Sequence, residues 1–195
     1  MSIYIIIKQD PDPPRDPYID LKLVPFEGSR EIFGFFIDYV DREVPEMDFS
    51  FTVNYPEALE EDLLTNDKFW PVFSERVIEM MNPQQLGLRT FRARMQDGNG
   101  NPLPGTFHAL QVKMTKGLVD IDKSDVTLSK SFPDSFKRVN SLVFKDPAGL
   151  PPLFRLREFK KILFVTGELA DRLNQADLKG MVLRPLDEFN FLFLQ

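Results

Sequence analysis

The sequence of 195 residues contains no cysteine and a single histidine, His108. Without cysteine the chain forms no disulfide, offers no thiolate to a metal and has no cysteine nucleophile. One imidazole excludes every site that needs two, which covers most catalytic zinc sites. We therefore expect neither a metal nor a cofactor.

Long apolar runs are also scarce near the N-terminus. The run from Ile3 to Ile7 is five residues long and has no basic flank before it. A secretory signal needs an apolar core of roughly 7–15 residues, and a membrane-spanning helix needs about 18. We expect a cytoplasmic protein without membrane contact.

The composition that remains is typical of a globular protein. Hydrophobic residues make up 43% of the chain and charged residues 28%. A chain of this length buries roughly 70% of the surface that its unfolded form exposes, so a hydrophobic core alone can hold it together. Composition therefore indicates a folded domain and leaves its function open.

Alternating and β-branched segments predict several strands. Residues Ile3–Ile7 are rich in β-branched side chains, and Phe49–Tyr55 alternates with its aromatic residues and Val53 on one face. The turn-forming stretch 96–105 predicts a hairpin between Leu88–Met95 and Thr106–Met114. The apolar run 32–40 fits a buried strand or a short buried helix, and the last apolar run predicts a strand over Phe189–Leu194. Four prolines within 10–17 predict an extended connection.

Two segments, 72–94 and 164–186, resemble each other at an offset of 92 residues. Ser74 and Thr166 are both helix-capping types that follow an apolar approach, and apolar pairs such as Val77 with Leu169 recur in register. Each segment predicts a strand, a short helix and a second strand. We expect an α+β fold with mixed or antiparallel sheets and a few short helices. An acidic N-terminal portion, 1–64, would join a portion 65–195 that carries the repeat, in one compact unit.

Negative charge is concentrated in the N-terminal third. Residues 1–70 hold 16 acidic and 6 basic side chains, whereas residues 71–195 hold 14 acidic and 18 basic ones. Such a chain can attract a basic protein and speed their encounter, or the acids can form a solvated face that serves solubility. Within 38–67 Arg42 is the one basic residue against ten acids, which are Asp38, Asp41, Glu43, Glu46, Asp48, Glu57, Glu60, Glu61, Asp62 and Asp67.

No motif for catalysis stands out. The oxygen-rich stretches that begin at Asp120 and Asp97 lack the glycine and glutamate of a calcium loop, and no glycine-rich phosphate loop is present. A catalytic triad would need His108 as its base, although a half-buried strand histidine is the simpler interpretation. Arg92 and Arg184 occupy equivalent repeat positions and suit either an anion clamp or outward pairing with acids. Trp70 suits core packing or, if exposed, a binding hot spot.

The order of several loose motifs points to a family. They are Phe69-Trp70-Pro71-Val72-Phe73-Ser74-Glu75-Arg76-Val77, Leu86-Gly87-Leu88-Arg89-Thr90-Phe91-Arg92-Ala93, Leu118-Val119-Asp120-Ile121-Asp122-Lys123-Ser124, Leu153-Phe154-Arg155-Leu156, Val165-Thr166-Gly167-Glu168-Leu169-Ala170-Asp171-Arg172-Leu173 and Leu178-Lys179-Gly180-Met181-Val182-Leu183-Arg184-Pro185-Leu186. This succession, over about residues 65–190, resembles bacterial immunity protein family 11.

The resemblance implies a protein that binds and neutralises the toxin encoded beside it in a polymorphic-toxin system of interbacterial competition. It implies no enzymatic activity and no catalytic residue. The family's toxins vary and include nucleases, whose substrate clefts are often basic. We therefore expect a toxin-binding surface on the acids and the tryptophan, with no direct nucleic-acid contact, comprising Asp38, Asp41, Glu43, Glu46, Asp48, Glu57, Glu60, Glu61, Asp62 and Trp70.

Two other functions remain open on the sequence. A small hydrolase would use carboxylates or His108 in a deep pocket. An acidic adaptor would bind a different regulatory partner. A toxin gene next to this one would favour the immunity function over both.

Overall fold

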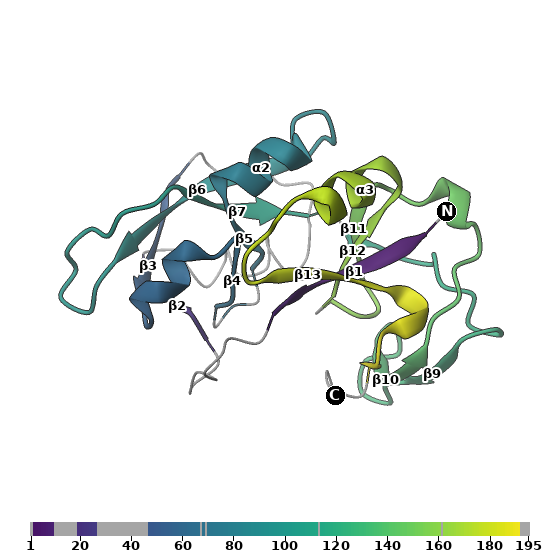
Figure 1. Ribbon diagram of the computed structural model, residues 1–195. Coiled ribbons are helices and arrows are strands. Elements are labelled where there is room, and N and C mark those ends of the chain that lie inside the picture. Colours follow the sequence, from purple (N-terminus) through teal and green to yellow (C-terminus); the bar gives the residue numbers. More distant parts are fainter. Residues whose placement is uncertain are drawn as a thin grey trace. The chain divides into compact units, whose positions relative to one another are not determined.

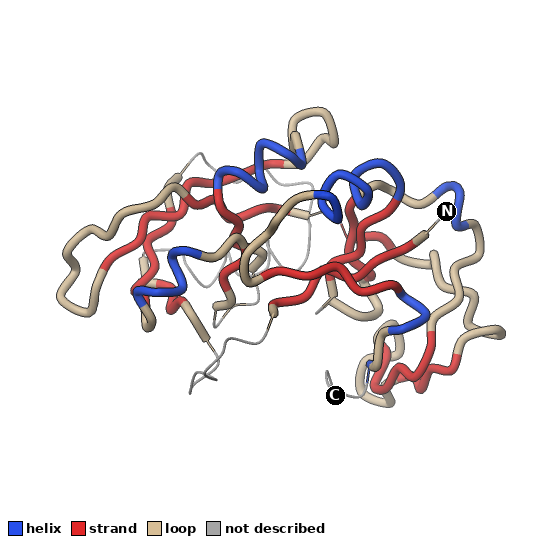
Figure 2. Tube along the Cα trace, in the orientation of Figure 1, coloured by secondary structure: helices blue, strands red, loops and turns tan. Residues whose placement is uncertain are grey.

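The computed structural model describes residues 2–9, 19–26, 47–66, 68, 70–112, 114–160 and 162–191. Strands dominate the described chain, with 39% strand against 18% helix (Figure 2). The sheets contain both parallel and antiparallel pairs. This confirms the predicted α+β fold with mixed sheets.

The chain divides into two compact units, each built from segments distant in sequence. The first unit comprises Met1–Ile7, Lys113–Gln175 and Leu183–Gln195, and the second comprises Lys8–Val112 and Ala176–Val182. The expected boundary between 64 and 65 lies inside the second unit, where two antiparallel strands pair across it.

A six-stranded sheet forms the second unit, in the order β2-β3-β6-β7-β5-β4 (Figure 1). The predicted hairpin is its centre, because β6 and β7 pair antiparallel from Arg89 opposite Gln111 to Ala93 opposite Phe107. The elements of this unit are β2 (Leu21–Leu23), β3 (Phe49–Val53), η1 (Pro56–Glu60), β4 (Leu63–Leu64), β5 (Val72–Ser74), α2 (Glu75–Met81), β6 (Arg89–Gln96) and β7 (Phe107–Gln111).

The predicted alternation of β3 builds the core of this unit. Phe49 and Phe51 are fully buried and Val53 nearly so. The Phe49 ring meets the ring of Phe91 edge-on, with centroids 5.6 Å apart. Edge-to-face contacts of this kind add about 0.5–1.5 kcal/mol to the stabilisation from burial.

A five-stranded sheet, in the order β13-β1-β12-β11-β8, forms most of the first unit. Its core includes Phe154 and Phe164, whose rings stack at 5.2 Å. The elements of this sheet and its helices are β1 (Ile3–Lys8), β8 (Met114–Thr115), η2 (Pro147–Gly149), β11 (Leu153–Leu156), β12 (Leu163–Thr166), α3 (Gly167–Gln175), β13 (Met181–Pro185) and η3 (Leu186–Glu188).

The internal repeat corresponds to two strand–helix–strand segments, β5-α2-β6 and β12-α3-β13. In each segment the two strands lie on either side of a strand from elsewhere, β7 in one case and β1 in the other. The Ser74 hydroxyl caps α2 by accepting from the Val77 amide at 3.5 Å. The Thr166 hydroxyl instead donates to the carbonyl of Pro151, so the two helix starts differ in detail.

A separate two-stranded sheet in the first unit pairs β9 (Asp125–Leu128) with β10 (Phe136–Ser141). One face of this hairpin joins the core of the unit through Phe136 and Val139.

The prediction of a C-terminal strand is wrong for the residues described. Phe189 follows the 3-10 helix η3, and its amide donates to the carbonyl of Leu186 instead of joining a ladder. The rings of Phe189 and Phe191 pack edge-on at 4.9 Å, and Phe191 is buried. A local turn and aromatic packing therefore hold residues 189–191 in place, and none of these three residues belongs to a strand.

Two predictions lie outside the described residues, namely the extended proline-rich connection at 10–17 and the apolar run 32–40. None of the helices in the described ranges is both long and apolar enough to cross a membrane.

Candidate functional site

The acidic turn, which we define as residues 57–62, follows β3 in the second unit. Its first part is the 3-10 helix η1, which starts at Pro56 and ends when the Glu61 amide donates to the carbonyl of Ala58. Ala58 is fully buried, so the helix is fixed to the core by its inner side. Glu57 and Glu60 are exposed on the outer side.

Glu61 points inward and takes part in a cluster of buried charges. The ammonium of Lys8 forms ion pairs with Glu61 and with Asp20, the latter at 2.8 Å, and donates to the carbonyl of Leu63 at 2.7 Å. The side chains of Lys8, Asp20 and Glu61 are only 6%, 4% and 14% exposed. The cluster therefore fastens the inner end of the acidic turn to Lys8 and to the residue before β2, all within the second unit.

Asp20 is ionised in this cluster. Burial by itself raises the pKa of its carboxyl, but a hydrogen bond from Lys8, the charge of Lys8 and two hydrogen bonds from Thr65 outweigh burial and hold the pKa below its ordinary value. A buried carboxylate is tolerated here because it is paired with the Lys8 ammonium and accepts hydrogen bonds from Thr65.

Asp62, the next residue, forms a second internal network. Its carboxylate accepts from the Ser74 hydroxyl at 2.6 Å and from the Lys179 amide at 2.8 Å, and it pairs with the guanidinium of Arg76. Burial raises the pKa of Asp62, yet these three partners together lower it below the ordinary value. Asp62 thus connects the acidic turn to the start of α2 and to the loop before β13 within the second unit.

The ten predicted partner-binding residues are therefore not equivalent. The side chains of Glu57 and Glu60 are exposed, whereas those of Glu61 and Asp62 are largely buried. Four further acids of the set lie outside the described residues, namely Asp38, Asp41, Glu43 and Glu46. Among the described residues of the predicted set, the exposed acids are Asp48, Glu57 and Glu60.

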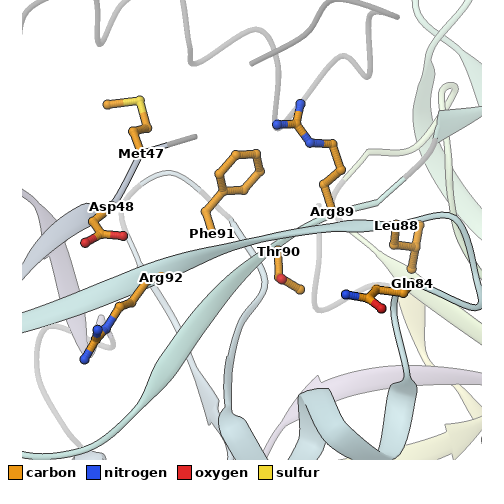
Figure 3. Close-up of a pocket in the computed structure, with 8 residues that line it drawn as sticks. All are labelled: Met47, Asp48, Gln84, Leu88, Arg89, Thr90, Phe91 and Arg92. Carbon is orange, nitrogen blue, oxygen red and sulfur yellow. The ribbon is translucent and has the colours of Figure 1, made fainter. Parts of the chain in front are cut away.

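Asp48 lies at a second feature of the unit, an open groove of about 590 Å³ beside the start of β6. Figure 3 shows Arg89 and Phe91 projecting from one side of β6, and Thr90 and Arg92 from the other. The exposed Asp48 carboxylate forms an ion pair with Arg94, whose Nε lies 2.7 Å from Oδ2. The groove is lined by Met47, Asp48, Gln84, Leu88, Arg89, Thr90, Phe91 and Arg92.

The groove is lined by both hydrogen-bond donors and hydrogen-bond acceptors. The guanidinium of Arg89 stacks over the Phe91 ring, 5.1 Å from its centroid, while Arg92 and Thr90 are exposed. Guanidinium groups, a hydroxyl and a carboxylate suit hydrogen bonding to a polypeptide, and the charged lining consists of two arginines and one aspartate. The sequence predicted Asp48 as a partner-binding residue but did not predict the groove. The groove depends on the parallel pairing of β3 with β6, which brings Asp48 beside the start of β6.

Trp70 belongs to the core, so its prediction as a partner-binding residue is corrected. Its side chain is 3% exposed, and its ring meets that of Phe49 edge-on at 4.9 Å and that of Phe51 at 6.1 Å. The core interpretation that the sequence left open is the one that the structure supports.

His108 lies on β7, opposite Arg92 on β6 and Phe73 on β5. Burial lowers the pKa of its imidazole, the carboxylate of Glu75 opposes this effect, and the charge of Arg92 adds to it. The Nε2 atom is buried and meets no hydrogen-bond partner among the described residues. His108 is therefore a neutral, half-buried strand residue at pH 7.

The other polar motifs have structural roles. The Asp97 carboxylate accepts from the amides of Asn99 and Asn101, both at 2.8 Å, and so closes the turn between β6 and β7. Arg92 and Arg184 belong to different units, as parts of β6 and β13. Over the described ranges, no three His, Cys, Asp or Glu side chains gather where they could hold a metal ion.

A comparison with protein-family models finds no match to the chain, and a search of curated proteins finds no relative. The likeness to bacterial immunity protein family 11 thus rests on the motifs quoted above.

Proposed function

We propose that this chain is an immunity protein that captures a toxin encoded beside its own gene and blocks it by stoichiometric binding in the cytoplasm of the producing cell. The observation that supports this most is the acidic turn. Two exposed carboxylates, those of Glu57 and Glu60, stand on a short helix whose inner side is fixed by Ala58 and by buried ion pairs. A rigid, negatively charged surface is what fast capture of a basic protein requires.

The proposed mechanism has two steps. The negative field of the acidic turn steers a toxin with a basic substrate cleft and raises the rate of encounter. The turn then occupies that cleft without rearranging, because Glu61 and Asp62 hold it from behind. Rigidity matters since ordering a flexible segment on binding would cost about 0.5–1.5 kcal/mol for each immobilised side chain.

The test uses the toxic domain of the neighbouring gene's product. Co-expression with this chain is expected to restore growth, and the two proteins are expected to co-purify at equal stoichiometry. Reversing both exposed charges, Glu57→Lys with Glu60→Lys, is expected to slow association at least about tenfold and to weaken protection.

A matched control is available on α3. Glu168 and Asp171 are exposed and also three residues apart, so reversing both changes the net charge equally. This control is expected to retain association and protection. If the two double variants behave alike, the acidic turn is not the binding site. If the wild-type chain neither binds nor protects, the immunity function itself is refuted.

His108→Ala separates this function from a hydrolase. A hydrolase that depends on the single imidazole would lose its activity in this variant. An immunity protein would keep full protection, because His108 lies within the sheet and its Nε2 is buried. Loss of protection in a folded His108→Ala protein, as judged by circular dichroism, would contradict the proposal.

A further inference from the structure

Exposed apolar side chains gather in one part of the first unit. Among the described residues, the large apolar side chains with high exposure are all found between 121 and 143, in and around the hairpin of β9 and β10. Phe132 at the hairpin tip is the most exposed, at 70%. The others are Ile121 at 51%, Leu128 at 47% and Val143 at 37%.

The tip that presents Phe132 is held in one shape by hydrogen bonds. The Phe132 amide donates to the Ser129 hydroxyl at 3.2 Å, and its carbonyl accepts from the Ser135 amide at 2.8 Å. The Ser129 amide closes the loop by donating to the carbonyl of Ser135. A fixed exposed aromatic ring loses little conformational entropy when a partner covers it.

The outer edge of β9 is open along the same stretch. The amides of Asp125 and Ser129 point toward β10, where they donate to the Ser141 hydroxyl and the Ser135 carbonyl. Because backbone groups alternate along a strand, Val126 and Leu128 present theirs to the opposite edge. No described segment pairs with that edge, since the sheet consists of β9 and β10 alone.

The other side of the hairpin is occupied by the chain itself. The Phe136 amide on β10 donates to the carbonyl of Glu158 at 2.8 Å. Of the two edges, β9 is therefore the one available to another strand. An open edge next to exposed apolar side chains invites pairing with another chain.

We propose that the β9 edge binds the β9 edge of a second copy of this chain, antiparallel and about a two-fold axis at Thr127. In this register Thr127 faces its own copy, and Val126 of each chain faces Leu128 of the other. Val126 and Leu128 are the residues with outward backbone groups, so the pairing forms four hydrogen bonds. Asp125 faces a serine, Ser129, and no like charges oppose each other within β9.

The same symmetry accounts for the exposed apolar side chains. An antiparallel two-fold places the tip of each hairpin near the base of the other, so Phe132 of one copy approaches Ile121 and Val143 of its mate. Cross-strand threonine pairs and apolar pairs each contribute about 0.2–1 kcal/mol. The pairing uses each open edge once, so the assembly closes as a dimer and does not grow into a fibre.

Sedimentation velocity on the purified chain, from about 1 to 500 µM, tests this proposal. We expect a monomer–dimer equilibrium that Leu128→Lys weakens at least about tenfold, because two added charges meet near the axis. Leu128 is already half exposed, so this variant is expected to fold. Asn174→Lys on the exposed face of α3 adds the same charge and is expected to leave the equilibrium unchanged.

Amide hydrogen exchange identifies the interface directly. The amides of Val126 and Leu128 are expected to gain protection as the protein concentration rises, while that of Thr127, already directed at β10, is expected to change little. A chain that stays monomeric at 500 µM, or a dimer that leaves the Val126 and Leu128 amides unprotected, would overturn the proposal. So would protection of this edge only on adding the neighbouring gene's product, which would assign the edge to that partner. None of these outcomes depends on the immunity function.

Discussion

Acidic residues close together in the sequence have opposite environments in this protein. Glu60 is exposed, whereas Asp62, two residues later, is 5% exposed and accepts from three donors. The buried Asp62 carboxylate is stabilised by charge-assisted hydrogen bonds from these donors, so replacing it costs more free energy than neutralising an exposed carboxylate. The two residues therefore differ in what they contribute to stability.

Asp62→Asn is expected to lower the free energy of unfolding at pH 7 by roughly 1–3 kcal/mol, measured by urea denaturation. The folded-state pKa of Asp62 lies below the ordinary value of 3.8, so the carboxylate stabilises the fold above that pH. This contribution is lost as the pH falls through the folded-state pKa. The difference between wild type and variant is therefore expected to shrink below about pH 4.

Glu60→Gln is the control for this prediction. The side chain is exposed, so the change is expected to stay within about 0.5 kcal/mol at every pH. Equal effects of the two substitutions would show that the Asp62 network adds nothing to stability.

At the scale of elements, the two strand–helix–strand segments share the way in which the second strand begins. A glycine with positive φ precedes each of these strands, Gly87 before β6 with φ 66° and Gly180 before β13 with φ 65°. The surroundings differ. Nothing lies within 4 Å of a Cβ built on Gly87, whereas one built on Gly180 would lie 2.8 Å from the Cβ of Glu61.

Gly180→Ala is expected to destabilise the protein by about 1–3 kcal/mol, because alanine strains the left-handed backbone and its methyl group displaces Glu61 from Lys8. Gly98→Ala is the control for the glycine-to-alanine change itself, because Gly98 lies in an open turn without a positive φ, and it is expected to stay within about 0.5 kcal/mol. Thermal and urea unfolding measure both.

A double-mutant cycle that combines Gly180→Ala with Glu61→Ala isolates the contact. If the methyl group added at position 180 acts through Glu61, part of the cost is expected to disappear in the Glu61→Ala background. An unchanged cost would assign the whole effect to backbone strain.

At the scale of the molecule, charge is distributed unevenly along the chain. The first 70 residues carry a net charge of −10 and the remaining 125 carry +4. Salt screens fields of this kind over about 10 Å at 0.1 M ionic strength, so it affects the encounter of two proteins more than their close contacts.

Under the proposed immunity function, association with the toxin is expected to slow by about tenfold between 0.05 and 0.5 M NaCl, with a smaller change in the dissociation rate. Stopped-flow mixing measures both rates. The variant with both Glu57 and Glu60 reversed is expected to show a weaker salt dependence. An association rate that does not respond to salt would contradict electrostatic steering.

Within the described residues, local pattern was enough to predict both α-helices and the strands β1, β3, β5, β6, β7, β12 and β13, but it gave no sign of β2, β4, β9 or β10. Alternation identified β3, the turn residues at 96–105 identified the hairpin of β6 and β7, and the similarity of 72–94 to 164–186 identified both strand–helix–strand segments. The strand predicted at Phe189 failed because apolar side chains alone do not distinguish a ladder from a turn packed on the core.

The candidate site was far less predictable. Lys8 and Glu61 are 53 residues apart, and the Lys179 amide lies 117 residues from Asp62. No periodicity links positions so distant in sequence. The ten-to-one excess of acids drew attention to this region, but the same excess gave no means of separating exposed carboxylates from buried ones.

The sequence by itself determined the α+β class, the two strand–helix–strand segments and the absence of cysteine chemistry, because these depend on composition and on side-chain order within about 25 residues. The tertiary structure alone decided which acids face solvent and that Trp70 is in the core. A carboxylate is stable inside a protein only where donors from other segments meet it, and that meeting is set by how the strands pair.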